Sequence, residues 1–162
     1  MLKIKIHERV KETFNPKTVT IGDQVWMTEN LAVDDGGDGI YVADDGTTYY
    51  SHDAAIRIAE NTPGWHLPTK AEWRAAAEAC GADSIGHYGD YTNITKLKRT
   101  LNIKLVGYYA GAFYPKGFYA DYWTSDILNE RTAYFYRFSL DGLLKDHTDS
   151  IEKGCVIRLI KD

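Results

Sequence analysis

The stretch WHLPTKAEW at residues 65–73 constrains the local fold more than any other part of this chain. Pro68 ends the segment before it, because proline disfavours a helical conformation in the residue that precedes it. Thr69 and Glu72 then have the spacing of a capping box, in which a hydroxyl and a carboxylate satisfy backbone amides at a helix start. We therefore predict a helix that begins at Thr69 and ends just before Gly81.

Hydrophobic periodicity changes along the chain from a helical pattern to a strand pattern. Ser51 is placed to cap an earlier helix, and a short third helix is expected over residues 93–101. Gly22-Asp23 forms a candidate hairpin turn, and the acidic, glycine-rich residues 34–48 are expected to be a loop. Strands are predicted at residues 2–6, 18–21, 24–27, 106–114, 118–125, 133–140 and 154–160. The fold class is therefore α+β, with two to three helices packed on a twisted antiparallel sheet.

Residues 133–141 alternate in a way that assigns their two faces. A shift of register by one residue would exchange the faces, so we expect one face to point firmly into the core. The predicted inward residues are Tyr134, Tyr136, Phe138 and Leu140. The opposite face would then display an exposed Phe135 beside Arg137, a combination common at interaction hot spots; an ordinary edge with a single exposed aromatic residue is the alternative.

Charge and composition exclude several classes of function. The net charge of -4 argues against a broad nucleic-acid interface, and no apolar stretch is long enough to span a membrane. Residues 1–17 are mainly basic and are expected to form a separate N-terminal strand or arm, leaving residues 18–162 as one domain. The alternation at residues 1–6 is also unlike the continuous apolar core of a secretory signal.

Metal and catalytic sites are only weakly indicated. Asp34, Asp35 and Asp38 could offer hard oxygen ligands to Ca²⁺, but this loop lacks the order of an EF-hand, so no cofactor is expected. The histidines have no serine or cysteine partner at a motif spacing, and His66 is most simply a packed turn residue. Cys80 and Cys155 could form one disulfide, although a reduced, buried pair is the simpler expectation.

Three ordered motifs resemble the Fibrobacter succinogenes major paralogous domain family. They are Ile21–Leu31 (IGDQVWMTENL), Gly64–Trp73 (GWHLPTKAEW) and Tyr122–Ser125 (YWTS), so the resemblance covers roughly residues 18–162. It implies a C-type-lectin-like fold, related to formylglycine-generating enzymes and to the variable proteins of diversity-generating retroelements. The tryptophans in these motifs are expected to fill the junction between helices and sheet.

The region from Tyr122 onward also resembles the variable region of retroelement-diversified proteins, which display ligand-contacting side chains on a lectin-like scaffold. Carried over by position, the resemblance implies that the ligand-binding residues are Asp126, Asn129, Arg131, Phe135 and Arg137. Retroelement targets are often rich in Asn and Ser here, whereas Ile127 and Leu128 are apolar. The resemblance is therefore closer for the scaffold than for the displayed side chains.

These observations lead us to expect a non-enzymatic binding module. The absence of a recognisable export signal favours a bacteriophage virion protein of a Bacteroidetes-type host, such as a fibre, tail-tip or capsid decoration protein. Its N-terminal segment would contact other virion proteins, its late strands would contact a host glycan or surface protein, and the chain would form a homo-oligomer. The alternatives are an exported bacterial cell-surface module and an enzyme of the formylglycine-generating type that uses Cys155.

Overall fold

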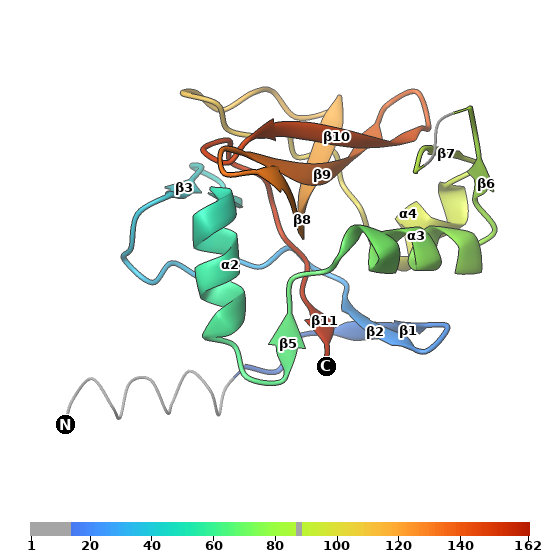
Figure 1. The fold of residues 1–162 in the computed structure, drawn as a ribbon, viewed down its shortest axis with the longest axis horizontal. Helices are drawn as coiled ribbons and strands as arrows, with labels where there is room; N and C mark the ends of the chain where they lie inside the picture. The colour runs from blue at the N-terminus through green and yellow to red at the C-terminus, as the bar shows by residue number, and fades with distance from the viewer. Residues whose placement is uncertain (1–13, 87–88) are drawn as a thin grey trace.

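The computed structural model describes residues 14–86 and 89–162, and within them three helices pack against antiparallel sheets (Figure 1). The helices are α2 (His52–Glu60), α3 (Lys70–Ala79) and α4 (Thr95–Thr100). The strands are β1 (Thr18–Ile21), β2 (Gln24–Met27), β3 (Ile40–Val42), β4 (Thr48–Tyr50), β5 (Trp65–His66), β6 (Asp83–Ser84), β7 (Tyr91–Thr92), β8 (Tyr119–Asn129), β9 (Thr132–Ser139), β10 (Leu144–Ser150) and β11 (Ile160–Lys161). The predicted α+β class is confirmed.

The helix starts follow the predicted caps. The Ser51 hydroxyl accepts a hydrogen bond from the backbone N–H of Ala54 at 3.2 Å and begins α2. At the start of α3, the Thr69 hydroxyl accepts from the Glu72 N–H at 3.1 Å, and the Glu72 carboxylate accepts from the Thr69 N–H at 2.9 Å. Both bonds of the capping box are therefore present, which supplies partners to amides that the helix itself leaves unpaired.

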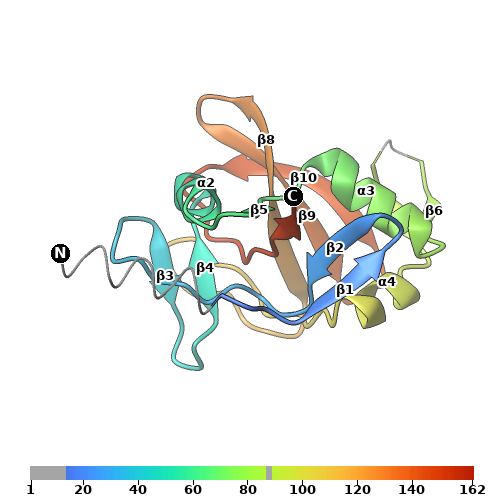
Figure 2. The same ribbon diagram turned by 90° about the horizontal axis from the view of Figure 1, so that it is seen from below.

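The largest sheet has five strands in the order β6-β7-β10-β9-β8. β8 and β9 form a long antiparallel hairpin, and β10 pairs with the other side of β9 along its whole length. The sequence pattern did not predict β10, because most of its residues are polar and it lacks apolar alternation. Figure 2 shows the β8–β9 hairpin extending beyond the rest of the sheet.

Three predicted segments differ from the structure. Residues 106–114 form a loop with isolated bridges, where Gly107 and Gly111 adopt positive φ angles. Within residues 154–160, Gly154, Cys155 and Val156 form isolated bridges, and only Ile160 belongs to a strand, β11. The predicted loop at residues 34–48 includes the strand β3, which pairs antiparallel with β4. The predicted strand at residues 2–6 lies outside the described residues.

A second sheet, in the order β1-β2-β11-β5, joins the early and late parts of the domain. The predicted hairpin at Gly22-Asp23 is confirmed, and Gly22 has a φ of +62°, which suits a tight hairpin turn. Ile160 pairs with both Trp26 and His66, so the last strand closes the sheet between β2 and β5. At the N-terminal edge, the Phe14 ring contacts Trp65 edge-on, with centroids 5.7 Å apart.

An aromatic core lies between this sheet, α3 and the large sheet. The Trp73 ring of α3 lies 4.6 Å from Trp26 and 5.4 Å from Tyr122, centroid to centroid. Tyr136 and Phe138 of β9 are fully buried here, as predicted. Leu140 was predicted to point inward, but it is 66% exposed, because β9 ends at residue 139 and Leu140 lies in the following turn.

Helix α2 covers a second core beside the β8–β9 hairpin (Figure 1). Trp123 is fully buried there, and its indole Nε1–H donates to the Tyr50 carbonyl at 2.6 Å. The tryptophans at 26, 73 and 123 are all fully buried, which confirms their predicted structural role, whereas Trp65 is half-buried. The β8 and β9 strands thus carry buried side chains on both of their faces.

Arg158 ties the last segment of the domain to its first half. The guanidinium is buried and donates to the Asn30 side-chain oxygen at 2.7 Å, to the Met27 carbonyl at 3.1 Å and to the Leu101 carbonyl at 2.5 Å. Burial lowers the pKa of Arg158 below its ordinary value.

No helix within residues 14–86 and 89–162 has the length and apolar character needed to cross a bilayer.

Candidate binding surface

Phe135 does not lie on an exposed face, so the prediction of its exposure was wrong. Its side chain is only 2% exposed and packs edge-on against Trp123, with ring centroids 5.9 Å apart. The His147 ring of β10 stacks on Phe135 at 5.5 Å, and the Lys153 ammonium lies 4.1 Å from the Phe135 ring centre. This face is covered because α2 and the residues after β10 pack against it.

Arg137 lies on the same face and is also engaged within the protein. Its guanidinium forms two hydrogen bonds with the Asp121 carboxylate, at 2.8 and 2.9 Å. Lys153 reaches the same carboxylate at 2.8 Å, and both Asp121 and Lys153 are buried. The Tyr108 and Tyr119 rings lie against Arg137, 5.4 and 4.2 Å from its Cζ atom. Arg137 thus holds the sheet and the preceding loop together.

The other three predicted binding residues lie toward the tip of the β8–β9 hairpin. Asp126 accepts a hydrogen bond from the Lys70 N–H at 2.9 Å and so contributes to the start of α3. Asn129 and Arg131 are exposed, and the Asn129 side chain accepts from the Arg131 N–H at 2.9 Å. Among the five predicted residues, only Asn129 and Arg131 present largely exposed side chains.

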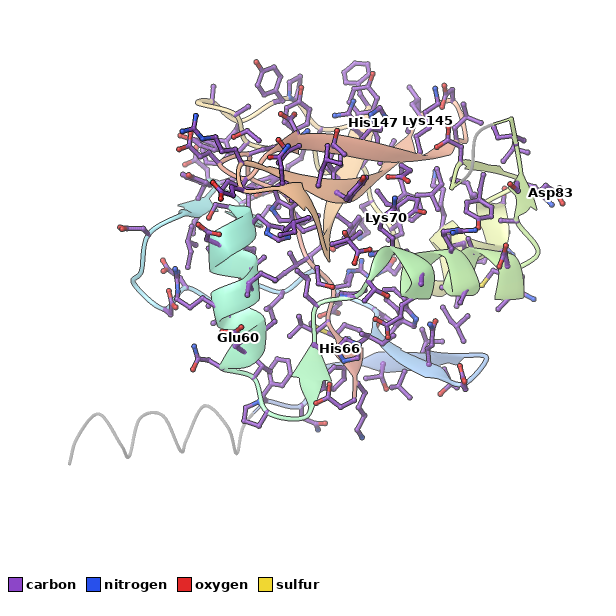
Figure 3. All side chains as sticks on the ribbon, viewed as in Figure 1. Glu60, His66, Lys70, Asp83, Lys145 and His147 are labelled. Carbon is purple, nitrogen blue, oxygen red and sulfur yellow. The ribbon has the colours of Figure 1, made fainter. Side chains whose placement is uncertain are left out.

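Figure 3 distinguishes the two faces of the large sheet. Lys70 lies between the sheet and α3, where its ammonium pairs with Asp146 at 2.8 Å and lies 3.8 Å from the Tyr134 ring centre. His147 and Lys145 belong to the face that also carries Phe135 and Arg137, since these residues are direct partners in the β9–β10 register. The predicted binding residues of β9 therefore belong to the face away from α3.

An open cleft of about 760 Å³ lies beside this hairpin. Its walls come from β3, from α2, from the loop after α4 and from the segment after β10; they include Tyr41, Asp53, Arg57, Tyr109, Ala110 and Glu152. Ser150 also lines the cleft and pairs with Thr132, the first residue of β9 after the hairpin turn. The hairpin tip that carries Asn129 and Arg131 therefore lies next to the cleft.

The aromatic wall of the cleft is built around Gly154. The Tyr41 and Tyr109 rings stack with centroids 3.9 Å apart. Tyr109 and Gly154 exchange two backbone hydrogen bonds, at 2.9 and 2.7 Å. A Cβ atom at position 154 would lie 2.7 Å from the Tyr109 side chain, so only glycine allows this close approach. The two rings are thus held in place by the backbone.

The opposite wall is held by Arg57 of α2. Its guanidinium makes two hydrogen bonds to the Asp35 carboxylate, at 2.8 and 3.0 Å, and a third to the Asp38 carbonyl at 3.0 Å. The hydrogen bond from Arg57 is the main cause that keeps the pKa of Asp35 below its ordinary value. The acidic loop is therefore anchored to α2, which fixes one side of the cleft.

Two other cleft carboxylates, those of Asp53 and Glu152, have no such partner. Both residues are exposed, and neither side-chain carboxylate forms a hydrogen bond or ion pair with another described residue. Burial, and then the charges of Tyr109 and Glu152, raise the pKa of Tyr41, so the phenol stays neutral near pH 7. The cleft thus combines the neutral phenol of Tyr41 with the unpaired carboxylates of Asp53 and Glu152.

The acidic loop does not gather its carboxylates around a common point. Asp34 accepts from the Gly36 N–H and Asp35 from the Gly37 N–H, each at 2.9 Å, which are turn-forming bonds within the loop. Within residues 14–86 and 89–162, no three His, Cys, Asp or Glu side chains are grouped closely enough to hold a metal ion. The weak sequence indication of Ca²⁺ therefore gains no support from this loop.

The side chains of Cys80, Cys155, His52 and His66 have structural roles. Both Cys80 and Cys155 are free and buried, and burial raises the pKa of the Cys155 thiol well above its ordinary value. His52 is buried, and its Nε2 atom lies 2.8 Å from the Thr124 carbonyl. His66 bridges two carboxylates instead of packing as a neutral turn residue: Nδ1 lies 2.7 Å from Asp162 and Nε2 lies 2.9 Å from Glu72.

Sequence reasoning did not identify Tyr41, Tyr109 or Glu152 as candidate binding residues. The available signal is the concentration of aromatic residues at 108–119, which fall largely within the two strands predicted at 106–114 and 118–125. No local pattern relates this loop to β3 or to residue 152, because these segments meet only in the folded domain.

Comparison of the chain with models of protein families, with curated proteins and with solved structures finds no match. The resemblance to the Fibrobacter succinogenes major paralogous domain family therefore stays a prediction from the three sequence motifs. What is established is an α+β domain with a cleft beside its late hairpin.

Proposed function

We propose that this protein is a non-enzymatic binding module with a C-type-lectin-like fold, displayed on the surface of a bacteriophage particle and contacting the host cell. The proposal takes its fold family from the three sequence motifs and its binding surface from the geometry. The ligand-contacting region consists of the cleft and the exposed hairpin residues Asn129 and Arg131.

The observation that carries the proposal is the cleft of about 760 Å³ with its stacked tyrosine pair. Pockets of this size accommodate small ligands or an anchoring side chain of a partner. Tyrosine provides a large contact area at a low cost in conformational entropy, which is why it is abundant in binding surfaces. The cleft also offers hydrogen-bonding groups from four separate segments.

The setting of Cys155 supports a binding function over formylglycine-type oxidation. A nucleophilic or redox-active cysteine has to form a thiolate that solvent or substrate can reach. The Cys155 side chain is fully buried, its backbone pairs with Tyr50, and burial raises the pKa of its thiol. Such a thiol suits the interior of the domain.

The test is attachment of purified, fluorescently labelled protein to cells of a Bacteroidetes-type host. Ala110 is exposed and lines the cleft, so Ala110→Trp would occupy the cleft without removing an internal contact. We expect this variant to lose most of its attachment. Ala79→Trp, at an exposed position of α3, is the matched control and should attach as the unmodified protein does. Equal attachment by both variants would refute the cleft as the binding surface.

The virion location is tested separately. Antibodies against the protein should label intact phage particles purified from an infected culture, as seen by immunogold electron microscopy. Labelling of the cell envelope in uninfected cultures, with unlabelled particles, would instead support the exported cell-surface module.

A further inference from the structure

The lining of the cleft contains more negatively than positively charged groups. Its lining includes four carboxylates, from Asp38, Asp53, Asp149 and Glu152, and two cationic groups, from Arg57 and Lys153. The Arg57 charge is satisfied by Asp35 at 2.8 Å. The Lys153 ammonium is buried and lies 2.8 Å from Asp121, which also pairs with Arg137, and 3.5 Å from Asp149. Neither cation pairs with the carboxylates of Asp38, Asp53 or Glu152, so the open part of the cleft carries an excess of negative charge.

The aromatic wall adds a second feature that favours a cation. The faces of aromatic rings carry negative potential and attract ammonium and guanidinium groups. The rings of Tyr41, Tyr109 and Phe113 form a continuous run: Tyr109 lies 3.9 Å from Tyr41 and 5.1 Å from Phe113, centroid to centroid. This run leads from inside the cleft to Phe113, which is 47% exposed.

The same chemistry occurs elsewhere in this protein. The Lys153 ammonium lies 4.1 Å from the Tyr108 ring centre and 2.8 Å from the Asp121 carboxylate. The Lys70 ammonium likewise lies 3.8 Å from the Tyr134 ring centre and 2.8 Å from Asp146. In each case a tyrosine and a carboxylate together hold one cation. Tyr41 and Glu152 offer this pair of groups without an internal cation to fill it.

From this geometry we infer that the cleft binds the positively charged side chain of a lysine or arginine in an exposed segment of a host surface protein. The inference rests on the proposed function and names its ligand class. The aromatic run favours a peptide, because Phe113 and the exposed Tyr114 next to it would contact apolar side chains that flank the basic residue. Acidic ligands, including acidic sugars and nucleic acids, would be repelled.

The test is isothermal titration of the full chain with short peptides whose ends are capped. One peptide has lysine between two apolar residues, and its matched partners have norleucine or glutamate in place of lysine. We expect the lysine peptide to bind about tenfold more tightly than the norleucine peptide, and the glutamate peptide not to bind. The preference for lysine should decrease as salt is added, because free charges in an open cleft are screened.

Variants of the cleft connect this preference to its carboxylates. Asp53→Asn and Glu152→Gln should each weaken binding of the lysine peptide several-fold and leave the norleucine peptide unaffected. Asp44→Asn is the matched control, since Asp44 is an exposed carboxylate outside the cleft lining. Equal affinity for lysine and norleucine peptides would overturn the inference. So would loss of lysine binding in Asp44→Asn, or tighter binding of a glucosamine oligomer than of any peptide.

The outcomes separate this inference from the proposed function. If Ala110→Trp abolishes attachment to cells while the peptides show no preference for lysine, the cleft is the binding surface but its ligand is not cationic. If the unmodified protein does not attach to cells at all, the proposed function itself fails.

Discussion

Arg137 forms a two-pronged ion pair with Asp121, its direct partner across the β8–β9 hairpin, and the Asp121 side chain is fully buried. Lys153 binds the same carboxylate from the segment after β10. One buried anion thus holds two cations and connects the sheet to a wall of the cleft. Breaking a buried pair leaves uncompensated charge, so this group is expected to be among the most sensitive positions in the domain.

Asp121→Asn should lower the free energy of unfolding by about 3–5 kcal/mol, because Arg137 and Lys153 would lose their common counter-ion inside the protein. Urea denaturation followed by circular dichroism measures the change. The control Asp44→Asn, at an exposed carboxylate, should stay within about 0.5 kcal/mol of the unmodified protein. A loss for Asp121→Asn as small as that of the control would show that the network does not stabilise the fold.

Phe135→Ala should destabilise the domain by about 3–5 kcal/mol, since it leaves a cavity beside Trp123 and His147. Leu128→Ala, at an exposed apolar residue of the same hairpin, should change stability by less than about 0.5 kcal/mol. Thermal unfolding of both variants measures the contrast. Similar melting temperatures for the two variants would mean that Phe135 is a surface residue after all.

His52 should make the domain less stable in acid. Burial is the main cause that holds the pKa of His52 below its ordinary value of 6.5, so the folded state disfavours the protonated ring. The stability that depends on the neutral ring is fully present above pH 6.5 and is lost as the pH falls through the lowered folded-state pKa. The stability difference between the unmodified protein and His52→Gln should therefore shrink as the pH is lowered. A difference that stays constant with pH would contradict the buried neutral ring.

His66 should show the opposite dependence. Burial works against protonation, but hydrogen bonds to Glu72 and Asp162 outweigh it and raise the pKa of His66 above 6.5. Its contribution is therefore fully present below pH 6.5 and is lost as the pH rises through the raised folded-state pKa. Chemical-shift titration of the His66 ring by NMR measures this pKa directly. A value at or below 6.5 would show that the two carboxylates do not hold the charged ring.

Both thiols should resist labelling in the native protein. Cys80 and Cys155 are buried and free, so Ellman's reagent should react with neither in buffer and with both after unfolding in urea. Cys155→Ala should leave attachment to cells unchanged once its effect on folding is accounted for. Rapid reaction of Cys155 in the native protein would revive an oxidative role for this residue.

The sequence predicted those elements whose interactions are local. The turn at Gly22, the cap at Ser51 and the capping box at Thr69 depend on residues within four positions of each other, and all three occur as expected. β10 was missed because its strand is stabilised by the neighbouring β9 and not by its own polar composition. The strand predicted at 106–114 is a loop in the structure, because apolar composition alone does not distinguish a strand from a loop packed on a sheet.

For the binding surface, the alternation of β9 follows from the sequence, and the resemblance to retroelement-variable proteins implied that Asn129 and Arg131 are displayed. The tertiary structure determines which side chains of that strand remain accessible, because α2 and Lys153 pack against Phe135 and Asp121 of β8 pairs with Arg137. The cleft likewise exists only where four segments separated along the chain come together. The physical reason is that secondary-structure periodicity depends on residues close in sequence. The burial of a side chain and its ion pairs depend instead on distant segments of the chain that pack against it.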